Sequence, residues 1–229
     1  PKTIIPRSKR NTGNHTGAKK NSKTMITILA ATRNRNKLRE IRSLLHDLPL
    51  SVLSYDDIDM PVDEIAESGA TFTENACIKA LKSAQATHMY AVADDSGLCV
   101  DALDGAPGIY SARYAGSEKS DYKNCRKILS EMSSVPDKDR SARFVCAIAF
   151  SSPKRIIETV EGDCSGLITR AMKGENGFGY DPVFYYPPKQ KTMAEMEPEE
   201  KNRLSHRYKA LTALKKVIKE YLDTGRETT

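Results

Sequence analysis

This 229-residue chain lacks several features that would define a protein class. Its apolar runs, such as ILAA and AIAF, fall far short of the ~18 residues that a membrane-spanning helix needs. No internal repeat is present, and no Pro- or Ser-rich linker follows residue 24. We therefore expect no membrane partner and one folding unit.

The cysteines are few, odd in number and far apart, at positions 77, 99, 125, 146 and 164. No CxxC pair occurs, which argues against a zinc site, and the spacing does not resemble a disulfide framework. Scattered reduced thiols are typical of intracellular proteins. We expect a cytoplasmic protein.

Acidic residues are absent from residues 1–24, which hold seven Lys or Arg, whereas the remainder holds 29 basic and 30 acidic residues. The net charge of +6 therefore belongs to this segment. Its composition predicts a disordered basic arm over 1–24, one catalytic domain over 25–224 and a tail over 225–229. Nucleic-acid binding through the arm stays an alternative.

Hydrophobic periodicity predicts alternating strands and helices early in the chain, followed by antiparallel strands. This order favours an α/β fold with a mixed sheet flanked by helices. The expected strands cover 25–31, 51–58, 89–93, 141–152 and 155–166, and the expected helices cover 36–48, 71–88, 121–134 and 197–222.

The turn AATRNRNK joins the first strand to the first helix. A helix N-terminus suits phosphate because its N–H groups are free and its dipole end is positive, and Thr32, Asn34 and Lys37 add donors and charge there. No glycine lies between Ile26 and Lys37, which excludes a Walker loop. The alternative is an ordinary capped helix with a surface lysine.

Two adjacent acids, Asp94 and Asp95, follow the strand expected over 89–93. Neighbouring strand residues point to opposite faces, so only one of them can enter a given site. That acid could hold Mg²⁺ or take a proton from water, and Glu67 could be a second ligand, with Glu74 as the other choice. The alternatives are an Asx turn and a solvated loop acid.

A flat ring could bind at NGFGYDP, residues 176–182. The glycines allow close approach, and Phe178 or Tyr180 could stack, unless the motif only buries one aromatic. His206 and Arg207 could read a carbonyl and a ring nitrogen. Lys201, one turn upstream, could contact substrate or form a solvated ion pair.

Motifs in this order make the chain resemble the inosine triphosphate pyrophosphatases from about Ile26 to Leu222. They are T-x-N-x-x-K at 32–37, ESGATFTENA at 67–76, ADDSGLCVDALDGAPGIYSARYAG at 93–116, GFGYDP at 177–182, EEK at 199–201 and SHR at 205–207. The long middle motif is highly specific.

The resemblance implies an enzyme that cleaves ITP, dITP and XTP between the α and β phosphates, giving the monophosphate and pyrophosphate. It implies a Mg²⁺ cofactor, a homodimer and an elongated mixed sheet with two lobes around a substrate cleft. Asp95 would be the general base and a metal ligand, together with Glu67. The implied substrate-binding residues are Thr32, Arg33, Asn34, Arg35, Asn36, Lys37, Ser96, Phe178, Gly179, Tyr180, Asp181, Lys201, His206 and Arg207.

One departure from the family pattern is Arg33, where many members have glycine. It adds charge near the expected phosphate site. The rival enzyme class is the Maf-type nucleotide pyrophosphatases, which act on pyrimidine or modified nucleotides, but GFGYDP and SHR favour a purine.

Overall fold

The computed structural model describes residues 26–58 and 65–224. The arm expected over 1–24 and the tail over 225–229 lie outside the described residues, so these two expectations stay predictions. Among the helices of the described part, none has the length and apolar character that crossing a membrane requires.

One sheet of seven strands, in the order β2-β1-β3-β4-β5-β6-β7, forms the centre of the described molecule. β1 is parallel to β2 and β3, and the pairs from β3 to β7 are antiparallel, which confirms the mixed sheet. The strands are β1 (Ile26–Ala30), β2 (Leu50–Leu53), β3 (Tyr90–Val100), β4 (Ser141–Ser151), β5 (Ile156–Ile168), β6 (Phe184–Tyr186) and β7 (Lys191–Thr192).

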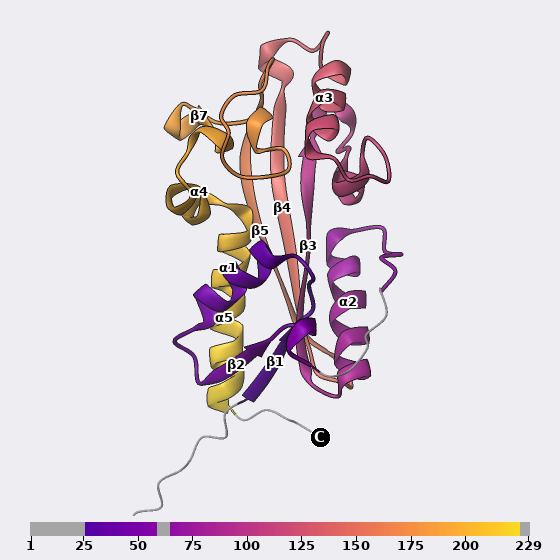
Figure 1. The fold of residues 1–229 in the computed structure, drawn as a ribbon, viewed down its shortest axis with the longest axis vertical. Helices are drawn as coiled ribbons and strands as arrows, with labels where there is room; N and C mark the ends of the chain where they lie inside the picture. Colours follow the sequence, from indigo (N-terminus) through magenta and orange to yellow (C-terminus); the bar gives the residue numbers. More distant parts are fainter. Residues whose placement is uncertain (1–25, 59–64, 225–229) are drawn as a thin grey trace, which may run out of the picture.

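Within the described residues five α-helices flank the sheet, and most follow the expected pattern. They are α1 (Arg35–Leu45), α2 (Phe72–Thr87), α3 (Asp121–Glu131), α4 (Pro198–Leu204) and α5 (His206–Thr224). The three long strands β3, β4 and β5 run through the whole length of an elongated molecule (Figure 1).

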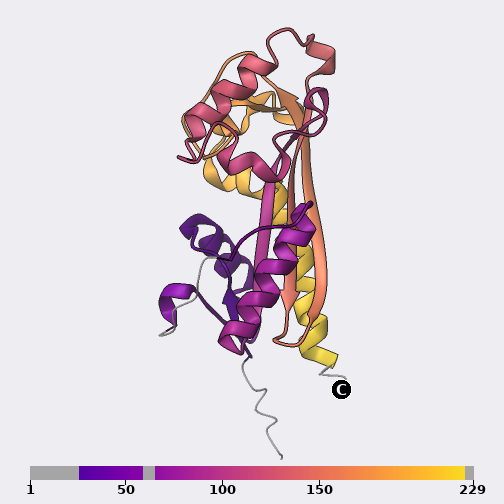
Figure 2. The ribbon, with the colours of Figure 1, turned by 90° about the vertical axis from the view of Figure 1, so that its right-hand side faces the viewer.

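Two lobes share these long strands. In one lobe, α1 and α5 cover one face of the sheet around Ile41, Val92 and Leu214, and α2 covers the other face with alanines such as Ala80. In the other lobe, α3 packs with the β6 segment around Phe184. Figure 2, turned by 90°, shows the same division, with α2 along one lobe and α3 at the far end. The expectation of an elongated two-lobed α/β fold is confirmed.

The strand expected over 89–93 is longer than the sequence indicated. β3 continues through Asp94 and Asp95 to Val100, because β4 pairs with it residue by residue from Ala91↔Ser151 to Val100↔Ala142. The two acids therefore lie in the middle of a strand, and the Asx-turn alternative is wrong.

Two other boundaries also differ. The helix expected over 197–222 is interrupted at Ser205, whose backbone is extended (φ −69°, ψ 150°) and whose Oγ accepts the Tyr208 N–H at 3.1 Å. The strand expected over 51–58 ends at Leu53, because Ser54 and Asp57 close a short 3₁₀ turn by capping each other.

The five cysteines are all free thiols. Burial raises the pKa of Cys125 and of Cys146 to about 12, with nearby carboxylates adding to the effect. The thiolate is the reactive form, so these two side chains act as packing groups.

Candidate active site

The site lies where β3 has an open edge. β1 pairs with β3 only as far as Val92, whose carbonyl accepts the Ala31 N–H at 2.8 Å. Farther along, the Leu98 N–H donates to Ser111 Oγ at 2.9 Å. Among the described strands, β4 alone pairs with the stretch between these two points. Side chains from both faces of β3 can therefore reach one edge.

A cavity of about 390 Å³ lies in this region, between the two lobes. Most of the residues expected to bind substrate line it: Asn34, Asn36, Lys37, Ser96, Phe178, Gly179, Tyr180, Asp181, Lys201, His206 and Arg207. The other expected residues are not among its lining: Thr32, Arg33, Arg35, Glu67 and Asp95. Parts of the chain that are far apart in sequence thus meet at one cavity.

The start of α1 forms one wall. Asn34 caps the helix, because its Oδ1 accepts the N–H groups of Asn36 (2.9 Å) and Lys37 (3.2 Å). Thr32 Oγ1 accepts the Asn34 N–H at 3.1 Å, so Thr32 shapes the turn and does not reach the cavity. The turn is therefore a capped helix start whose lysine lines the cavity, and phosphate binding by it stays a prediction.

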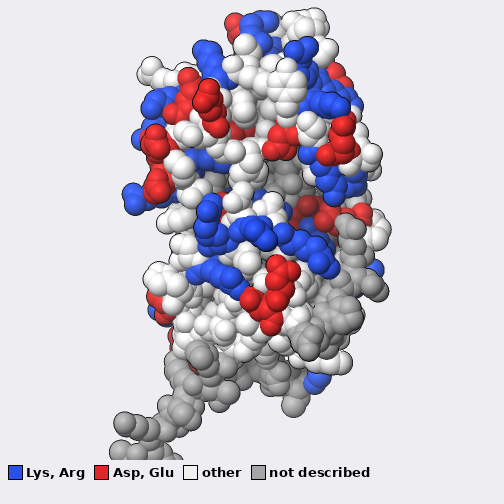
Figure 3. Space-filling model, viewed as in Figure 1, with Lys and Arg blue, Asp and Glu red and all other residues white. Residues whose placement is uncertain are grey.

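Positive charge is concentrated at this level of the molecule. Figure 3 shows Lys and Arg gathered in a band across the middle of the face on which α1 begins. Arg33 and Arg35 are exposed beside Lys37, and the Arg33 guanidinium lies 5.2 Å from the centre of the Tyr55 ring. Such a band attracts anions.

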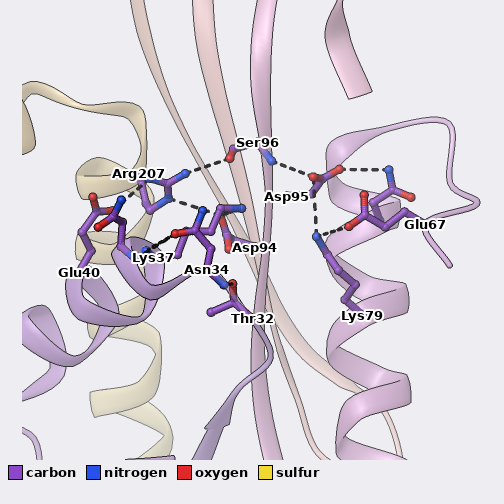
Figure 4. A network of polar contacts seen from close by, with 12 residues as sticks. Thr32, Asn34, Lys37, Glu40, Glu67, Lys79, Asp94, Asp95, Ser96 and Arg207 are labelled. Carbon is purple, nitrogen blue, oxygen red and sulfur yellow. Dashed lines mark hydrogen bonds and ion pairs between the residues drawn. The ribbon is translucent and has the colours of Figure 1, made fainter. Parts of the chain in front are cut away.

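Asp94 is the anion that orders the cationic side of the site (Figure 4). Its Oδ2 lies 2.8 Å from Lys37 Nζ and 3.4 Å from Arg207 Nε. Arg207 also donates to Glu40 Oε2 and to Ser96 Oγ, both at 3.1 Å. Burial alone would raise the pKa of Asp94, but Lys37 and Arg207 hold that pKa well below its usual value. Asp94 is therefore ionised and keeps two cations in place.

Asp95 faces the opposite side of β3, as strand alternation predicts. Its Oδ1 accepts the Ser96 N–H at 3.0 Å and its Oδ2 accepts Asn75 Nδ2 at 3.1 Å. Lys79 Nζ lies 3.7 Å from Asp95 Oδ1 and 2.9 Å from Glu67 Oε1 (Figure 4). Burial, with a smaller contribution from Glu67, raises the pKa of Asp95 although Lys79 opposes the shift.

The pair Asp95 and Glu67 fits a hard divalent cation. Both carboxylates converge on one positive group, the Lys79 ammonium. Within 26–58 and 65–224, no cluster of three or more His, Cys, Asp and Glu side chains is suited to hold a metal. Mg²⁺ typically binds one or two carboxylates and completes its shell with water and substrate phosphates, so two are enough. Glu74, the other choice, accepts the Ala70 N–H at 2.6 Å through Oε2, and the assignment of Glu67 over Glu74 stays a prediction.

The glycine-rich loop offers a ring face on the other side of the cavity. Phe178 is 38% exposed and Lys201 Nζ lies 4.4 Å from the centre of its ring. Tyr180 is buried and donates its hydroxyl to the Ser111 carbonyl at 2.7 Å. Of the two aromatics, Phe178 is thus the one available for stacking.

Asp181 holds this loop in shape. It accepts the Phe178 N–H at 2.8 Å and forms an ion pair with Lys201 Nζ. Gly177 has φ +83°, and a Cβ at this position would lie 2.1 Å from Asp181 Oδ2, so only glycine fits.

His206 is half-buried and stacks on Phe144, with ring centres 4.9 Å apart. Burial, and then the charges of Arg207 and Lys201, lower the pKa of His206 well below its usual value. The imidazole is therefore neutral near pH 7, with one donor and one acceptor nitrogen.

Sequence reasoning missed Glu40, Asn75 and Lys79. Asn75 and Lys79 are four residues apart on α2 and so lie on the same helix face as each other, directed at Asp95. Glu40 follows Lys37 by one turn in α1. Helical spacing from Lys37 was the available signal for Glu40, position within the motif ESGATFTENA was the signal for Asn75, and spacing from Asn75 was the signal for Lys79.

Comparison with known proteins places this geometry in a family. The model of the Ham1 family matches residues 28–217. A dITP/XTP pyrophosphatase of Halalkalibacterium halodurans is 51% identical over 189 residues, which cover 82% of this chain and 96% of that protein. A dITP/XTP pyrophosphatase of Geobacillus kaustophilus is 50% identical over 191 residues, which cover 83% of this chain and 93% of the relative.

A solved structure agrees with these relatives. The HAM1 protein from Coxiella burnetii is 43% identical and superposes with a TM-score of 0.79, covering 86% of this chain and all of that one. The match with the family model spans most of the chain and includes both sides of the cleft. The chain belongs to the Ham1 family.

Proposed function

We propose that this protein hydrolyses non-canonical purine nucleoside triphosphates (ITP, dITP and XTP) to the monophosphate and pyrophosphate, and so cleanses the nucleotide pool. The observation that carries the proposal is one cleft lined by the exposed Phe178 ring and by Lys37, with the carboxylates of Asp95 and Glu67 on the other face of β3, outside that lining. Relatives about half identical over nearly their full length are named dITP/XTP pyrophosphatases.

The base would stack on Phe178 with Lys201 and Arg207 nearby. Lys201 and Arg207 can only donate hydrogen bonds, and the neutral His206 adds one more donor. These donors suit the 6-oxo group of hypoxanthine or xanthine, which accepts hydrogen bonds. A 6-amino group would place donor against donor and leave buried groups unpaired, which discriminates strongly. Uracil and thymine also carry an oxo group, so the preference for purines over the pyrimidines of the Maf-type alternative rests on the relatives named dITP/XTP pyrophosphatases.

The triphosphate would lie along the open edge of β3. The positive dipole end of α1 faces this edge, and Lys37, held by Asp94, supplies a fixed charge there. We assign Asp95 as the group that orients and deprotonates the attacking water, since its burial favours proton uptake. Glu67 and Asp95 would hold Mg²⁺, which when bound supplies charge neutralisation for the phosphates and the leaving pyrophosphate.

Three finer proposals accompany this function: Mg²⁺ as the metal, a homodimer and a cytoplasmic location. Metal identity is tested by comparing Mg²⁺, Mn²⁺ and Ca²⁺ in the hydrolysis assay. Light scattering after gel filtration gives the mass in solution, and imaging of the tagged full chain gives the compartment.

The deciding experiment is hydrolysis of ITP, dITP, XTP, GTP, ATP, dTTP and UTP side by side, with the products identified. We expect the three non-canonical purines to be cleaved most efficiently, with release of pyrophosphate. Faster turnover of UTP or dTTP would point to the Maf-type activity, and release of single phosphates would exclude cleavage between the α and β phosphates.

A further inference from the structure

Asn75 bonds to Asp95 and to the loop that carries Glu67, but it belongs to neither the cavity lining nor the expected site. We propose that Asn75 is a positioning residue. It ties the loop that carries Glu67 to Asp95 and so sets the affinity of this pair for a divalent metal ion. The proposal rests on the proposed function, since that function assigns the metal to Glu67 and Asp95.

The Asn75 side-chain amide forms two hydrogen bonds, one through its oxygen and one through its nitrogen. It is 1% exposed, its Oδ1 accepts the Gly69 N–H at 2.8 Å and its Nδ2 donates to Asp95 Oδ2 at 3.1 Å. Gly69 is two residues from Glu67 in the same loop. One planar group therefore connects the loop before α2 with the middle of β3.

The loop is packed closely on the first turn of α2, so it follows the position of Asn75. A Cβ at Gly69 would lie 2.6 Å from the Glu74 Cβ and 2.9 Å from Asn75 Oδ1. The Ala70 N–H is held by Glu74, and Thr71 Oγ1 accepts the Glu74 N–H at 3.1 Å. These contacts leave little freedom between Asn75 and the segment that begins at Glu67.

The orientation of the Asp95 carboxylate depends on two hydrogen bonds, one to each oxygen. The Ser96 N–H holds Oδ1, and Asn75 holds Oδ2. With only one of them, the carboxylate could rotate about its last torsion. Hydrogen bonds to metal-binding carboxylates fix their orientation, and their loss typically costs metal affinity.

The chemistry of the two contacts explains why an amide is present. Gly69 needs an acceptor and Asp95 needs a donor, and a carboxamide supplies both from one short side chain. A carboxylate would present only acceptors and would add a negative charge about 3 Å from Asp95 Oδ2, which is unfavourable in a buried place.

The chain offers a matched control in Asn124. It is also 1% exposed and lies in the first turn of α3, and its Oδ1 accepts a loop N–H, that of Ala115, at 2.8 Å. Its Nδ2 donates to the backbone carbonyls of Ser111 and Ala112 instead of to a carboxylate. Asn75→Ala and Asn124→Ala therefore remove equivalent buried amides, one bonded to Asp95 and one bonded to backbone groups alone.

Two measurements test the proposal on the full chain. Mn²⁺ binding to the nucleotide-free protein is measured by electron paramagnetic resonance, and the Mg²⁺ concentration for half-maximal pyrophosphate release is measured with ITP. Asn75→Ala is expected to weaken Mn²⁺ binding about 10- to 100-fold and to raise the Mg²⁺ midpoint in parallel. Asn124→Ala is expected to lower the melting temperature while leaving Mn²⁺ affinity unchanged.

A second variant covers the case in which Asn75→Ala does not fold. Gly69→Ala pushes the loop away from Asn75 without removing the Asn75–Asp95 hydrogen bond, and it should weaken Mn²⁺ binding in the same direction. Wild-type Mn²⁺ affinity in a folded Asn75→Ala or Gly69→Ala protein overturns the proposal, as does an equal loss in Asn124→Ala. A wild-type chain that binds Mn²⁺ but cleaves no purine triphosphate would contradict the proposed function alone, because the binding comparison remains valid.

Discussion

Asp94 and Asp95 are adjacent in the chain, but each has its own cations. Lys37 and Arg207 neutralise Asp94 on one side of β3, and Lys79 approaches Asp95 on the other side. Their repulsion is thus offset by side chains of the protein. The two acids therefore have separate environments: Asp94 anchors cations, and Asp95 is the carboxylate proposed to act on water and metal.

Asp95→Asn should abolish most turnover and leave substrate binding largely intact. The amide cannot accept a proton from water, and loss of a general base typically costs about 10²- to 10⁴-fold in kcat. Pyrophosphate release gives kcat, and calorimetry with a non-hydrolysable ITP analogue gives affinity. Asp163→Asn, an exposed change on β5, is the control and should behave as wild type. Unchanged turnover in Asp95→Asn would remove Asp95 from the catalytic role.

Asp94→Ala should instead reduce stability strongly. It leaves Lys37 and Arg207 facing each other without their shared buried anion, and removing one partner of a buried ion pair costs about 3–5 kcal/mol. Urea unfolding measures the change in free energy. The comparison is Glu118→Ala, whose partner Lys123 is exposed, with an expected loss of about 0–1 kcal/mol. Similar losses in both variants would contradict the structural role of Asp94.

At the scale of single elements, the sequence predicted the helices and strands whose bounds depend on neighbouring residues in the chain. The helix over 72–87 was expected almost in full, because its Thr71 cap and its alanine face are both visible in the sequence. The length of β3 could not be expected, because Asp94 and Asp95 are poor strand residues and only pairing with β4 keeps them extended. The candidate site shows the same limit. The sequence motifs identified most of its residues, but the contacts of Asn75 could be seen only in the folded structure.

The break between α4 and α5 has a local cause that can be tested. Ser205 Oγ accepts the Tyr208 N–H, so this serine caps α5 and directs His206 and Arg207 at the cavity. Ser205→Ala should destabilise the protein by about 1 kcal/mol and raise the KM for ITP more than it lowers kcat. Ser205→Thr, which keeps a hydroxyl, should retain most of both. Urea unfolding and steady-state kinetics measure the two effects, and a KM equal to wild type would argue against the positioning role.

At the scale of the whole molecule, the two lobes are joined by shared strands, and close backbone packing sets their geometry. Gly162 on β5 shows this directly: a Cβ there would lie 2.4 Å from the His206 carbonyl oxygen and 2.5 Å from the Ala210 nitrogen. α5 therefore approaches the sheet at the point where His206 enters the cleft. Sequence periodicity identified the inward face of α5. It contained no information on how closely α5 approaches β5, because that distance depends on Gly162, which lies over forty positions before His206 in the chain.

The partly buried His206 makes the stability of the whole protein depend on pH. Its folded pKa lies well below the ordinary value of 6.5, because burial and the charges of Arg207 and Lys201 disfavour the protonated form. Below pH 6.5 the unfolded chain binds a proton that the folded chain does not, so protonation favours unfolding. The free energy of unfolding should therefore fall as pH decreases below about 6.5, by at most about 1.4 kcal/mol per pH unit from this group.

Urea unfolding at intervals from pH 8 to pH 5 measures this dependence in the wild type and two variants. His206→Phe can stack on Phe144 but cannot bind a proton, so the slope below pH 6.5 should decrease by the contribution of this residue. His46→Gln, which removes an exposed histidine at the end of α1, is the control variant. Equal slopes in His206→Phe and wild type would mean that His206 takes up its proton in the folded protein, and the neutral imidazole assigned to base recognition would be wrong.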